Sequence, residues 1–417
     1  MRTHERSIKD IETCYGCGVC AGICPNNALS MMVTGDIGYY RHSHTKENCT
    51  NCGKCLQVCP WNNLDVDLIN NEIFGENSNS MIGQYIDCYT GYAINDDIRR
   101  SCSSGGIVSS ILIYMLKRNM IQGVIVTKMS SLDPTKIEPF IARNVDDIVS
   151  ATGSKYASVS FDKVIKEIKD FDGELAVVGL PCHIQAIRKL ESIDQNIKKK
   201  IKYHLGLMCS GTIGLKGTKI LLDSFEIPKE SINSFSYRGN GWPGGFSVHD
   251  GHVKRSIRYP LYISIIRTYL QPSCLMCWDS TNEFSDISFG DAWELVNEDN
   301  IGTSLLITRT IEGDKLLKAA KLDSMIDISK IDASKVLKSQ SGNISFKKHL
   351  LEFRLFMFEV LFGNRPNFCN VFMYKDINVK NILRTFMLFI RTYLSNNRYT
   401  SKIVDHITIY ILKRNIK

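Results

Sequence analysis

Eight cysteines carry the clearest chemistry in this sequence, because they fall in two sets with the same spacing. In each set, three cysteines are separated by two residues, and a fourth follows after three more residues, directly before a proline. The two sets read Cys14-x-x-Cys17-x-x-Cys20-x-x-x-Cys24-Pro25 and Cys49-x-x-Cys52-x-x-Cys55-x-x-x-Cys59-Pro60. Three thiolates at this spacing can hold three iron corners of a [4Fe–4S] cubane, and the remaining corner takes a cysteine from elsewhere. The spacing therefore predicts two iron–sulfur clusters.

The doubled pattern resembles the bacterial two-cluster ferredoxins, in which the fourth cysteine of each run ligates the other cluster. The resemblance implies that one cluster is held by Cys14, Cys17, Cys20 and Cys59, and the other by Cys49, Cys52, Cys55 and Cys24. A pair of structural zinc sites is an alternative, because zinc also binds Cys-x-x-Cys, although it needs no third step of this spacing. A disulfide framework is a further alternative. Two clusters are our prediction.

Length and composition are those of a soluble globular protein. The chain has 417 residues, of which 44% are hydrophobic and 23% are charged, and this length is enough for two or three domains with a sizeable core. Residues 1–10 lack the apolar segment of a signal peptide, and no uninterrupted apolar stretch reaches the length of a transmembrane helix. Fifteen cysteines in such a chain favour metal ligation in a reducing cytoplasm over disulfides.

The positive charge is concentrated at the C-terminal end. The chain has a formal net charge of +8, and residues 375–417 contain nine lysines and arginines against two aspartates, so the remainder is nearly neutral. This distribution gives no support for a nucleic-acid partner. A helix expected in this tail places apolar residues on one face with basic residues nearby: Leu383, Met387, Ile390 and Leu394, with Arg384 and Arg391. Such a helix can lie peripherally on an anionic membrane surface or contact a partner, and packing against its own domain is the alternative.

The periodicity of the chain predicts a small N-terminal unit, an α/β domain and a helical end. The first unit is expected over about 11–68, with a hairpin from 28–33 and 39–41 and a linker rich in Asn and Ser over 62–80. From residue 84 onward, strand and helix patterns alternate, which predicts an α/β domain with a mixed sheet. The expected strands are 91–94, 123–127, 174–180, 203–208, 286–289 and 304–308, and the expected helices are 107–117, 161–168 and 184–190.

Seven short motifs follow one another in the α/β region. They are Ser103-Ser104-Gly105-Gly106, Gly153-Ser154-Lys155-Tyr156, Gly179-Leu180-Pro181-Cys182-His183-Ile184-Gln185-Ala186, Gly206-Leu207-Met208-Cys209-Ser210-Gly211, Tyr237-Arg238-Gly239-Asn240-Gly241-Trp242-Pro243-Gly244, Cys274-Leu275-Met276-Cys277-Trp278-Asp279 and Asp286-Ile287-Ser288-Phe289-Gly290-Asp291-Ala292-Trp293. Their identity and order resemble the coenzyme F420 hydrogenase/dehydrogenase beta-subunit family, here fused to a ferredoxin unit. The resemblance covers roughly residues 84–350.

The resemblance implies a division into four parts. Residues 1–75 form an α+β ferredoxin-like dicluster domain. Residues 84–160 are the N-terminal module of the family and residues 161–345 its C-terminal module, which together imply an α/β flavoprotein domain with a mixed sheet. Residues 346–417 form a helical, basic C-terminal extension, which the resemblance leaves unexplained.

The resemblance also implies FAD and a third cluster. Members of the family bind FAD beside a [4Fe–4S] cluster, and members without the ferredoxin unit still hold one cluster, so its ligands come from the core. We therefore assign Cys182, Cys209, Cys274 and Cys277 to a third [4Fe–4S] cluster. Four thiolates also suit zinc, and buried free cysteines are the other alternative.

The expected cofactor-binding and catalytic residues lie in the same motifs. The residues expected to bind FAD are Ser103, Ser104, Gly105, Gly106, Ser154, Lys155, Tyr156 and Trp242. The first four precede a helix, where backbone N–H groups and hydroxyls suit a pyrophosphate, and an ordinary serine N-cap is the alternative. Lys155 offers a cation and Tyr156 a stacking ring, although a solvated loop would also hold both. The catalytic candidates are Lys155 and Asp291, and the alternative for Asp291 is a capping carboxylate.

Together these features predict an FAD-dependent iron–sulfur oxidoreductase. Reduced ferredoxin or reduced coenzyme F420 would supply electrons through the clusters, and the flavin would reduce a small-molecule substrate. Polysaccharide biosynthesis is one setting that the family resemblance implies. The alternative is an electron-transfer subunit of a larger redox complex without a substrate site of its own, and a zinc-stabilised binding protein is a third class.

Overall fold

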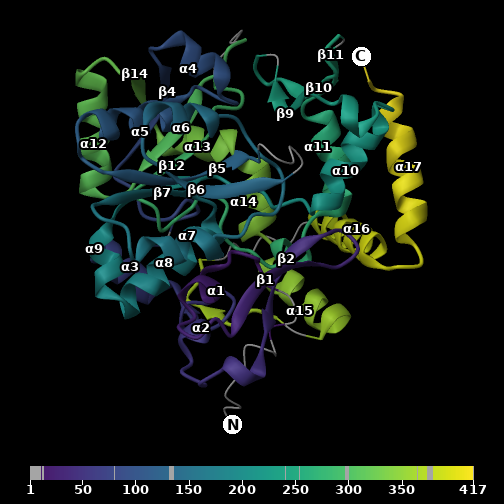
Figure 1. The fold of residues 1–417 in the computed structure, drawn as a ribbon, viewed down its shortest axis with the longest axis horizontal. Helices are drawn as coiled ribbons and strands as arrows, with labels where there is room; N and C mark the ends of the chain where they lie inside the picture. Colours follow the sequence, from purple (N-terminus) through teal and green to yellow (C-terminus); the bar gives the residue numbers. More distant parts are fainter. Residues whose placement is uncertain are drawn as a thin grey trace.

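A large mixed β-sheet with helices on both faces forms the centre of the molecule, and the cysteine-rich N-terminal unit lies beneath it in Figure 1. The structure is a computed structural model, and it describes residues 11, 14–78, 80–130, 136–239, 241–252, 254–295, 300–363, 365–372 and 379–416. The strands of the sheet, in spatial order, are β14 (Ile326–Ile331), β4 (Asp87–Ala93), β13 (Ser304–Thr308), β12 (Ile287–Asp291), β8 (Ile201–Leu207), β7 (Leu175–Gly179), β5 (Gly123–Met129) and β6 (Ile137–Ala142).

The sheet confirms the expected mixed α/β architecture. The four neighbouring strands β12, β8, β7 and β5 run parallel, whereas the pairs formed by the outer strands are antiparallel. Each of the six expected strands is present. The edge strands β6 and β14 were not predicted from the sequence. In β14 only Ile326 and Ile328 are buried, so this strand has a weak apolar pattern.

Helices cover both faces because successive side chains of a strand point in opposite directions. One face carries α5 (Ile107–Lys117), α6 (Val145–Ser150) and α12 (Ile311–Leu322), and the other carries α7 (Asp162–Ile168), α8 (Pro181–Ile193) and α9 (Gln195–Lys200). In β5, Val124 and Val126 are buried in the core on the first face, while Ile125 is buried on the second. Helix α8 begins three residues earlier than expected, because Pro181 suits the first position of a helix.

The N-terminal unit contains the expected hairpin together with short helices that we did not predict. Its elements are α1 (Val19–Ile23), β1 (Leu29–Thr34), β2 (Tyr39–His44), the 3-10 helix η2 (Lys46–Asn48), α2 (Lys54–Gln57), β3 (Leu64–Asp65) and α3 (Val66–Phe74). Helix α3 lies where a linker was predicted, so the linker prediction was wrong for this segment. The Asp65 side chain caps the helix by accepting from the amides of Asp67 and Leu68, and Val66 and Ile69 lie on the buried face of the helix.

The N-terminal unit packs directly against the α/β domain. The amide of Phe161 donates to the carbonyl of Cys17 at 2.9 Å, and Gln271 Nε2 donates to the carbonyl of Cys14 at 2.9 Å. Lys189 Nζ donates to the carbonyl of Cys59 at 3.0 Å. At Gly18, which has a φ of +83°, a Cβ would lie 2.6 Å from the amide nitrogen of Asp162. The first cysteine run is therefore held against the domain by backbone contacts that leave no room for a side chain.

The remaining elements surround the sheet and form the expected helical end. They are α4 (Asp96–Ser101), α10 (Leu215–Ser224), η3 (Lys229–Ser231), β9 (Ser234–Gly239), β10 (Gly245–His249), β11 (Lys254–Arg258), α11 (Leu261–Ile266), η4 (Arg267–Tyr269), η5 (Pro272–Leu275), α13 (Ala333–Ser339), α14 (Ser341–Lys348), α15 (Leu351–Phe362), β15 (Phe368–Cys369), α16 (Val379–Asn396) and α17 (Ser401–Lys413). Strands β9, β10 and β11 form a small antiparallel sheet. Strand β15 pairs with β3 and ties the C-terminal segment to the N-terminal unit.

Candidate functional site: buried cysteines beside a cavity

The core cysteines come from segments that the sheet brings together. Strands β7 and β8 are parallel neighbours, with Gly179 opposite Gly206, so the segments after their carboxyl ends lie side by side. Cys182 follows β7 in the first turn of α8, and Cys209 follows β8. Cys274 lies in η5 and Cys277 just beyond it, and both are buried.

The four core cysteines lie in one region, where Cys274 and Cys277 are buried and Cys182 and Cys209 are half-buried. Burial raises the pKa of Cys182 well above its usual range, and the thiols of Cys17, Cys209, Cys274 and Cys277 raise it further. Burial raises the pKa of Cys209 to about 12, with Cys274 and Cys277 contributing in the same direction. In the described part of the chain, no three His, Cys, Asp or Glu side chains are arranged to hold a single metal ion. Ligation by these cysteines stays a prediction.

The two N-terminal runs lie close to each other through their fourth cysteines, and cluster ligation by these cysteines stays a prediction. Burial raises the pKa of Cys17 to about 12, and the next contribution comes from Cys59 of the second run, followed by Cys14. The pKa of Cys55 is raised by burial and, among its neighbours, by Cys52 and by Cys24 of the first run. Each fourth cysteine therefore lies near the other set.

Tyr15 links the first run to the core cysteines. Burial raises its pKa, and the thiols of Cys277, Cys182, Cys274 and Cys59 add to the effect. Its ring contacts Trp61 edge-on at 5.2 Å between centroids. This position of Tyr15 could not be predicted from the sequence, because a single tyrosine inside a cysteine run has no recognisable spacing of its own.

Two buried cations from α14 and α15 lie beside the core cysteines, and neither was predicted from the sequence. Lys347 is 1% exposed and Arg354 is fully buried. Lys347 Nζ donates to the carbonyl of Cys274 at 3.2 Å, and Arg354 donates to the carbonyls of Leu275 and Lys347. The Arg354 Nε atom is buried and has no hydrogen-bond partner. These cations lie after the motif series, in a segment that was predicted only as part of a helical extension.

A cavity of about 330 Å³ opens beside Cys209 and contains most of the expected flavin residues. The expected residues that line it are Ser103, Ser104, Gly106, Ser154, Lys155, Tyr156 and Asp291. Arg238, Tyr259 and Trp293 also line it and were not in the expected set. Gly105 lies behind the wall, where a Cβ would meet the carbonyl of Gly91 at 2.5 Å. Trp242 packs on Trp293, with 5.0 Å between ring centroids.

The serine-glycine motif shapes one end of this cavity mainly through its backbone. Ser103 Oγ accepts from the amide of Ser154 at 2.7 Å, which joins two of the motifs. Ser104 Oγ donates to the carbonyl of Thr303 at 3.0 Å. Gly106 is the N-cap of α5 with a φ of +78°, and it has no side chain to accept from the first amides of the helix. Residues 106–109 line the cavity, and free amides in the first turn of a helix can bind an anion.

Lys155 closes the end of α6. Its Nζ donates to the carbonyls of Ala151, Thr152 and Gly153 at 2.6, 2.9 and 2.9 Å, and burial lowers its pKa to about 8. The three bonds occupy the ammonium donors, so this side chain shapes the cavity wall. Neighbouring Tyr156 contacts Tyr237 edge-on at 5.8 Å between centroids.

Asp291 holds Arg238 in the cavity wall. Its carboxylate accepts from Arg238 Nη1 at 2.7 Å and from Trp242 Nε1 at 3.4 Å. The guanidinium lies 4.6 Å from the ring centroid of Tyr259, and Arg238 Nη2 is buried without a partner. Asp291 therefore positions a cation, a role that neither sequence alternative described.

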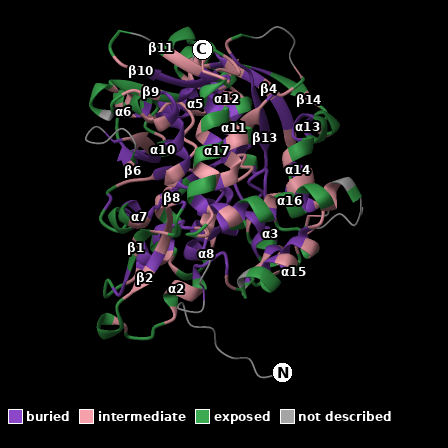
Figure 2. Ribbon diagram, turned by 90° about the vertical axis from the view of Figure 1, so that its right-hand side faces the viewer, coloured by how far each residue is buried: buried purple, intermediate pink, exposed green. Residues whose placement is uncertain are grey.

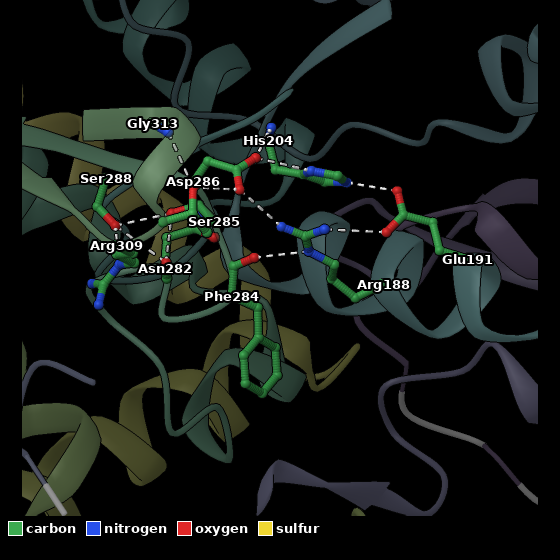
Figure 3. A network of polar contacts seen from close by, with 11 residues as sticks. Arg188, Glu191, His204, Asn282, Phe284, Ser285, Asp286, Ser288, Arg309 and Gly313 are labelled. Atoms are coloured by element: carbon green, nitrogen blue, oxygen red, sulfur yellow. Dashed lines mark hydrogen bonds and ion pairs between the residues drawn. The ribbon is translucent and has the colours of Figure 1, made fainter. Parts of the chain in front are cut away.

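A buried polar network joins helix α8, which carries Cys182, to strand β8, which precedes Cys209 (Figure 3). His204 in β8 contacts Glu191 Oε1 through Nε2 at 2.7 Å and Asp286 Oδ2 through Nδ1 at 3.2 Å. Arg188 contacts the same two carboxylates, each at 3.3 Å. Although burial alone raises the pKa of Asp286, Arg188 and His204 hold it well below its usual range. The network ties α8 to β8 and to the segment before β12.

Family comparisons agree with the motifs and with the fold. Residues 88–166 match the N-terminal model of the family described as "Coenzyme F420 hydrogenase/dehydrogenase, beta subunit", and residues 172–334 match its C-terminal model. The chain belongs to this family. Residues 13–63 match a "4Fe-4S dicluster domain", so it is an iron–sulfur member.

Individual relatives are similar at low identity. The "Coenzyme F420 hydrogenase subunit beta" of Methanosarcina barkeri is 24% identical over 259 residues, covering 61% of this chain and 85% of the relative. The "Coenzyme F420-dependent sulfite reductase" of Methanocaldococcus jannaschii is 26% identical over 248 residues, covering 56% of this chain but only 37% of the relative. A chain in the solved F420-reducing [NiFe] hydrogenase complex of Methanosarcina barkeri is 21% identical, covers 69% of this chain and 97% of that chain, and has a TM-score of 0.54. That likeness shows a shared fold.

Proposed function

We propose that this family member is an iron–sulfur flavoprotein oxidoreductase that passes electrons from its ferredoxin unit through a core cluster to FAD. The observation that carries the proposal is the continuous series of cysteines from the surface to the cavity. Cys52 of the second run is exposed, Cys55 of that run lies near Cys20 of the first, and Cys17 lies near Cys182. Cys209 then lines the cavity. Closely spaced clusters along this series would carry single electrons inward.

The charge around the core cysteines fits a [4Fe–4S] cluster. A cluster bound by four thiolates is negatively charged, and a buried negative charge needs nearby compensation. Lys347 and Arg354 supply it, because both are buried and both contact the segment that carries Cys274 and Cys277. We propose that Cys182, Cys209, Cys274 and Cys277 hold this cluster.

The cavity fits FAD at both its polar and its apolar parts. The first amides of α5 suit the pyrophosphate, and the unpartnered Nη2 of Arg238 offers a further donor in the wall. Apolar side chains such as Leu112 and Val126 line the interior. FAD, when bound, converts between the single electrons of clusters and the two-electron chemistry of a carbon substrate. Asp291 keeps Arg238 oriented, and Lys155 keeps the neighbouring wall in place.

The names of the relatives support a chemical class for the electron donor and for the substrate, but no individual compound. Because relatives are named coenzyme F420 hydrogenase subunits, we propose reduced coenzyme F420 or a ferredoxin as the donor and a small molecule, in polysaccharide biosynthesis for example, as the acceptor. The alternative is an electron-transfer subunit of a larger complex, and the likeness to a hydrogenase-complex chain supports it. We place the chain in the cytoplasm, with its C-terminal helices in peripheral contact with the membrane.

The test is anaerobic purification followed by metal and flavin analysis. Three cubanes contain about twelve irons per chain, and FAD should be released on denaturation. Zinc in place of iron, with no flavin, would overturn the proposal. Turnover of reduced coenzyme F420 with an artificial acceptor by the isolated chain separates the enzyme from the alternative, because a carrier without a substrate site should turn over only with its partner subunits.

A further inference from the structure

The last two helices turn their polar side chains toward the protein and their apolar side chains toward solvent. In α16, Thr385, Thr392 and Ser395 are buried, and in α17 Ser401 and Thr408 are buried. Ser395 Oγ donates to the carbonyl of Thr268 at 2.7 Å, and the Tyr269 hydroxyl donates to Asp405 Oδ1 at 2.9 Å. The attachment to the body thus uses polar contacts together with Phe389 and Leu412, which are buried.

The outward side of the two helices is a large apolar surface. Its exposed side chains are Val379, Leu383, Phe386, Met387, Ile390 and Tyr393 of α16 and Ile403, Ile407, Tyr410 and Ile411 of α17. Leu383 is 57% exposed and Ile403 is 62% exposed. Figure 2 looks onto both helices and shows long stretches of each as exposed. A surface helix normally has the opposite orientation, and a contiguous apolar surface of this kind marks a contact site.

The charges on this outward surface are of one sign. Arg384, Arg391, Arg398 and Lys402 are exposed among the apolar residues, and they take part in no ion pair within the described part of the chain. The carboxylate that the structure describes in these helices, Asp405, faces the body, where Lys216 Nζ lies 2.8 Å from its Oδ2 atom. The outward surface is therefore both apolar and cationic.

We propose that α16 and α17 form an interfacial anchor that lies on an anionic lipid bilayer. Anionic headgroups complement the arginines and lysine, and the apolar side chains enter the boundary between headgroups and acyl chains. No described helix is long and apolar enough to cross a bilayer, and a helix lying in the plane does not need to. A second copy of this surface carries the same positive charge and would be repelled, so a bilayer suits it better than self-association. The inference does not depend on the redox proposal.

The test is sedimentation of the full-length protein with vesicles. We expect binding to vesicles of equal parts phosphatidylglycerol and phosphatidylcholine, little binding to phosphatidylcholine alone, and release at high salt. Replacing Arg384, Arg391, Arg398 and Lys402 by Gln should weaken binding at least about tenfold. The control with the same change in net charge replaces the exposed Lys163, Lys169, Lys198 and Lys199 by Gln, and it should bind like the wild type.

An apolar pair of variants completes the test. Ile403→Ser with Ile407→Ser should abolish binding, while Ile311→Ser with Leu322→Ser, on the exposed side of α12, should not. Circular dichroism melting checks that each variant is folded. If both charge variants bind vesicles equally weakly, the binding depends only on the net charge of the protein, and the anchor proposal is overturned. The proposal would also be overturned by a dimer that the Ile403 and Ile407 substitutions dissociate, or by no vesicle binding of the wild type, which would assign the surface to a protein partner.

Discussion

The two kinds of cysteine site in this molecule are built by different means. Each N-terminal run supplies three closely spaced cysteines from one continuous segment, and Gly16, Gly18 and Gly53 have φ values of +72°, +83° and +72°, which allow the tight turns. The core cysteines arrive from separate segments that only the sheet brings together. A local site can be recognised from spacing alone, whereas the core site requires the fold.

The two sites also differ in their surroundings. Cys52 of the second run is exposed, while Cys274 and Cys277 are buried next to the cations Lys347 and Arg354. If both kinds of site hold clusters, the surface cluster is solvated and the core cluster is stabilised by buried positive charge. This contrast predicts that single substitutions will affect one site and spare the other.

The largest expected effect is a variant that loses its FAD and keeps all of its iron. Gly106→Asp places a carboxylate at the start of α5, where its charge repels the phosphates at the proposed pyrophosphate site and its Cβ presses on Arg99 and Ala93, and we expect FAD binding to be abolished. Iron content should stay at the wild-type level. Flavin released on denaturation and iron are both measured on the anaerobically purified protein.

The control is Gly342→Asp, because a Cβ at Gly342 has no neighbour within 4 Å. This variant should keep its FAD. Wild-type flavin content in Gly106→Asp would show that the pyrophosphate lies elsewhere in the cavity.

The next effect should remove one cluster of the three. Cys277→Ser and Cys182→Ser should each lose about one third of the iron and keep most of the FAD. Reduction of the N-terminal clusters by a ferredoxin-level donor should persist, while reduction of the flavin slows greatly, because the intermediate site is lost. Cys88→Ser, at a buried cysteine of β4 outside both sites, should change neither quantity. Full iron content in Cys277→Ser would leave the core thiols as packing residues.

A smaller effect should distinguish two adjacent lysines. Lys347 contacts the carbonyl of Cys274, whereas Lys348, equally buried, pairs with Glu283 at 2.7 Å. Lys347→Met should lower the reduction potential of the core cluster, because a nearby cation stabilises the more negative, reduced form. Lys348→Met should leave the potential unchanged and cost stability, on the order of 3 kcal/mol, since Glu283 loses its partner. Redox titration followed by electron paramagnetic resonance measures the potential, and equal shifts in both variants would contradict the assignment.

The features that could be predicted from the sequence are those encoded over short distances. The cysteine runs, the six strands of the sheet and the motifs proposed to bind FAD all have local patterns, and the structure brings most of the residues expected to bind FAD to one cavity. Lys155 bonds to carbonyls only two to four residues before it, but its residue type suited a phosphate equally well, so this role was not predicted. The role of Asp291 could not be predicted, because it depends on Arg238, fifty-three residues away. The positions of Lys347 and Arg354 beside the core cysteines could not be predicted either, because burial of a cation beside a thiol is a property of the tertiary fold.

The smallest effect concerns His204, which supports the core site without touching a cysteine. Burial and Arg188 oppose its protonation, but Glu191 and Asp286 prevail and raise its pKa. A raised pKa in the folded state means that the charged histidine stabilises the fold fully below its unfolded pKa of about 6.5, and that this contribution is lost as the pH rises through the folded pKa. His204→Gln should therefore reduce the melting temperature more at about pH 6 than at about pH 9. His252→Gln, at an exposed histidine, should show no such difference. The iron of the N-terminal runs should be unaffected at either pH, because the network lies on α8, β8 and the segment before β12; a loss of iron from both regions would mean that the two kinds of site unfold together.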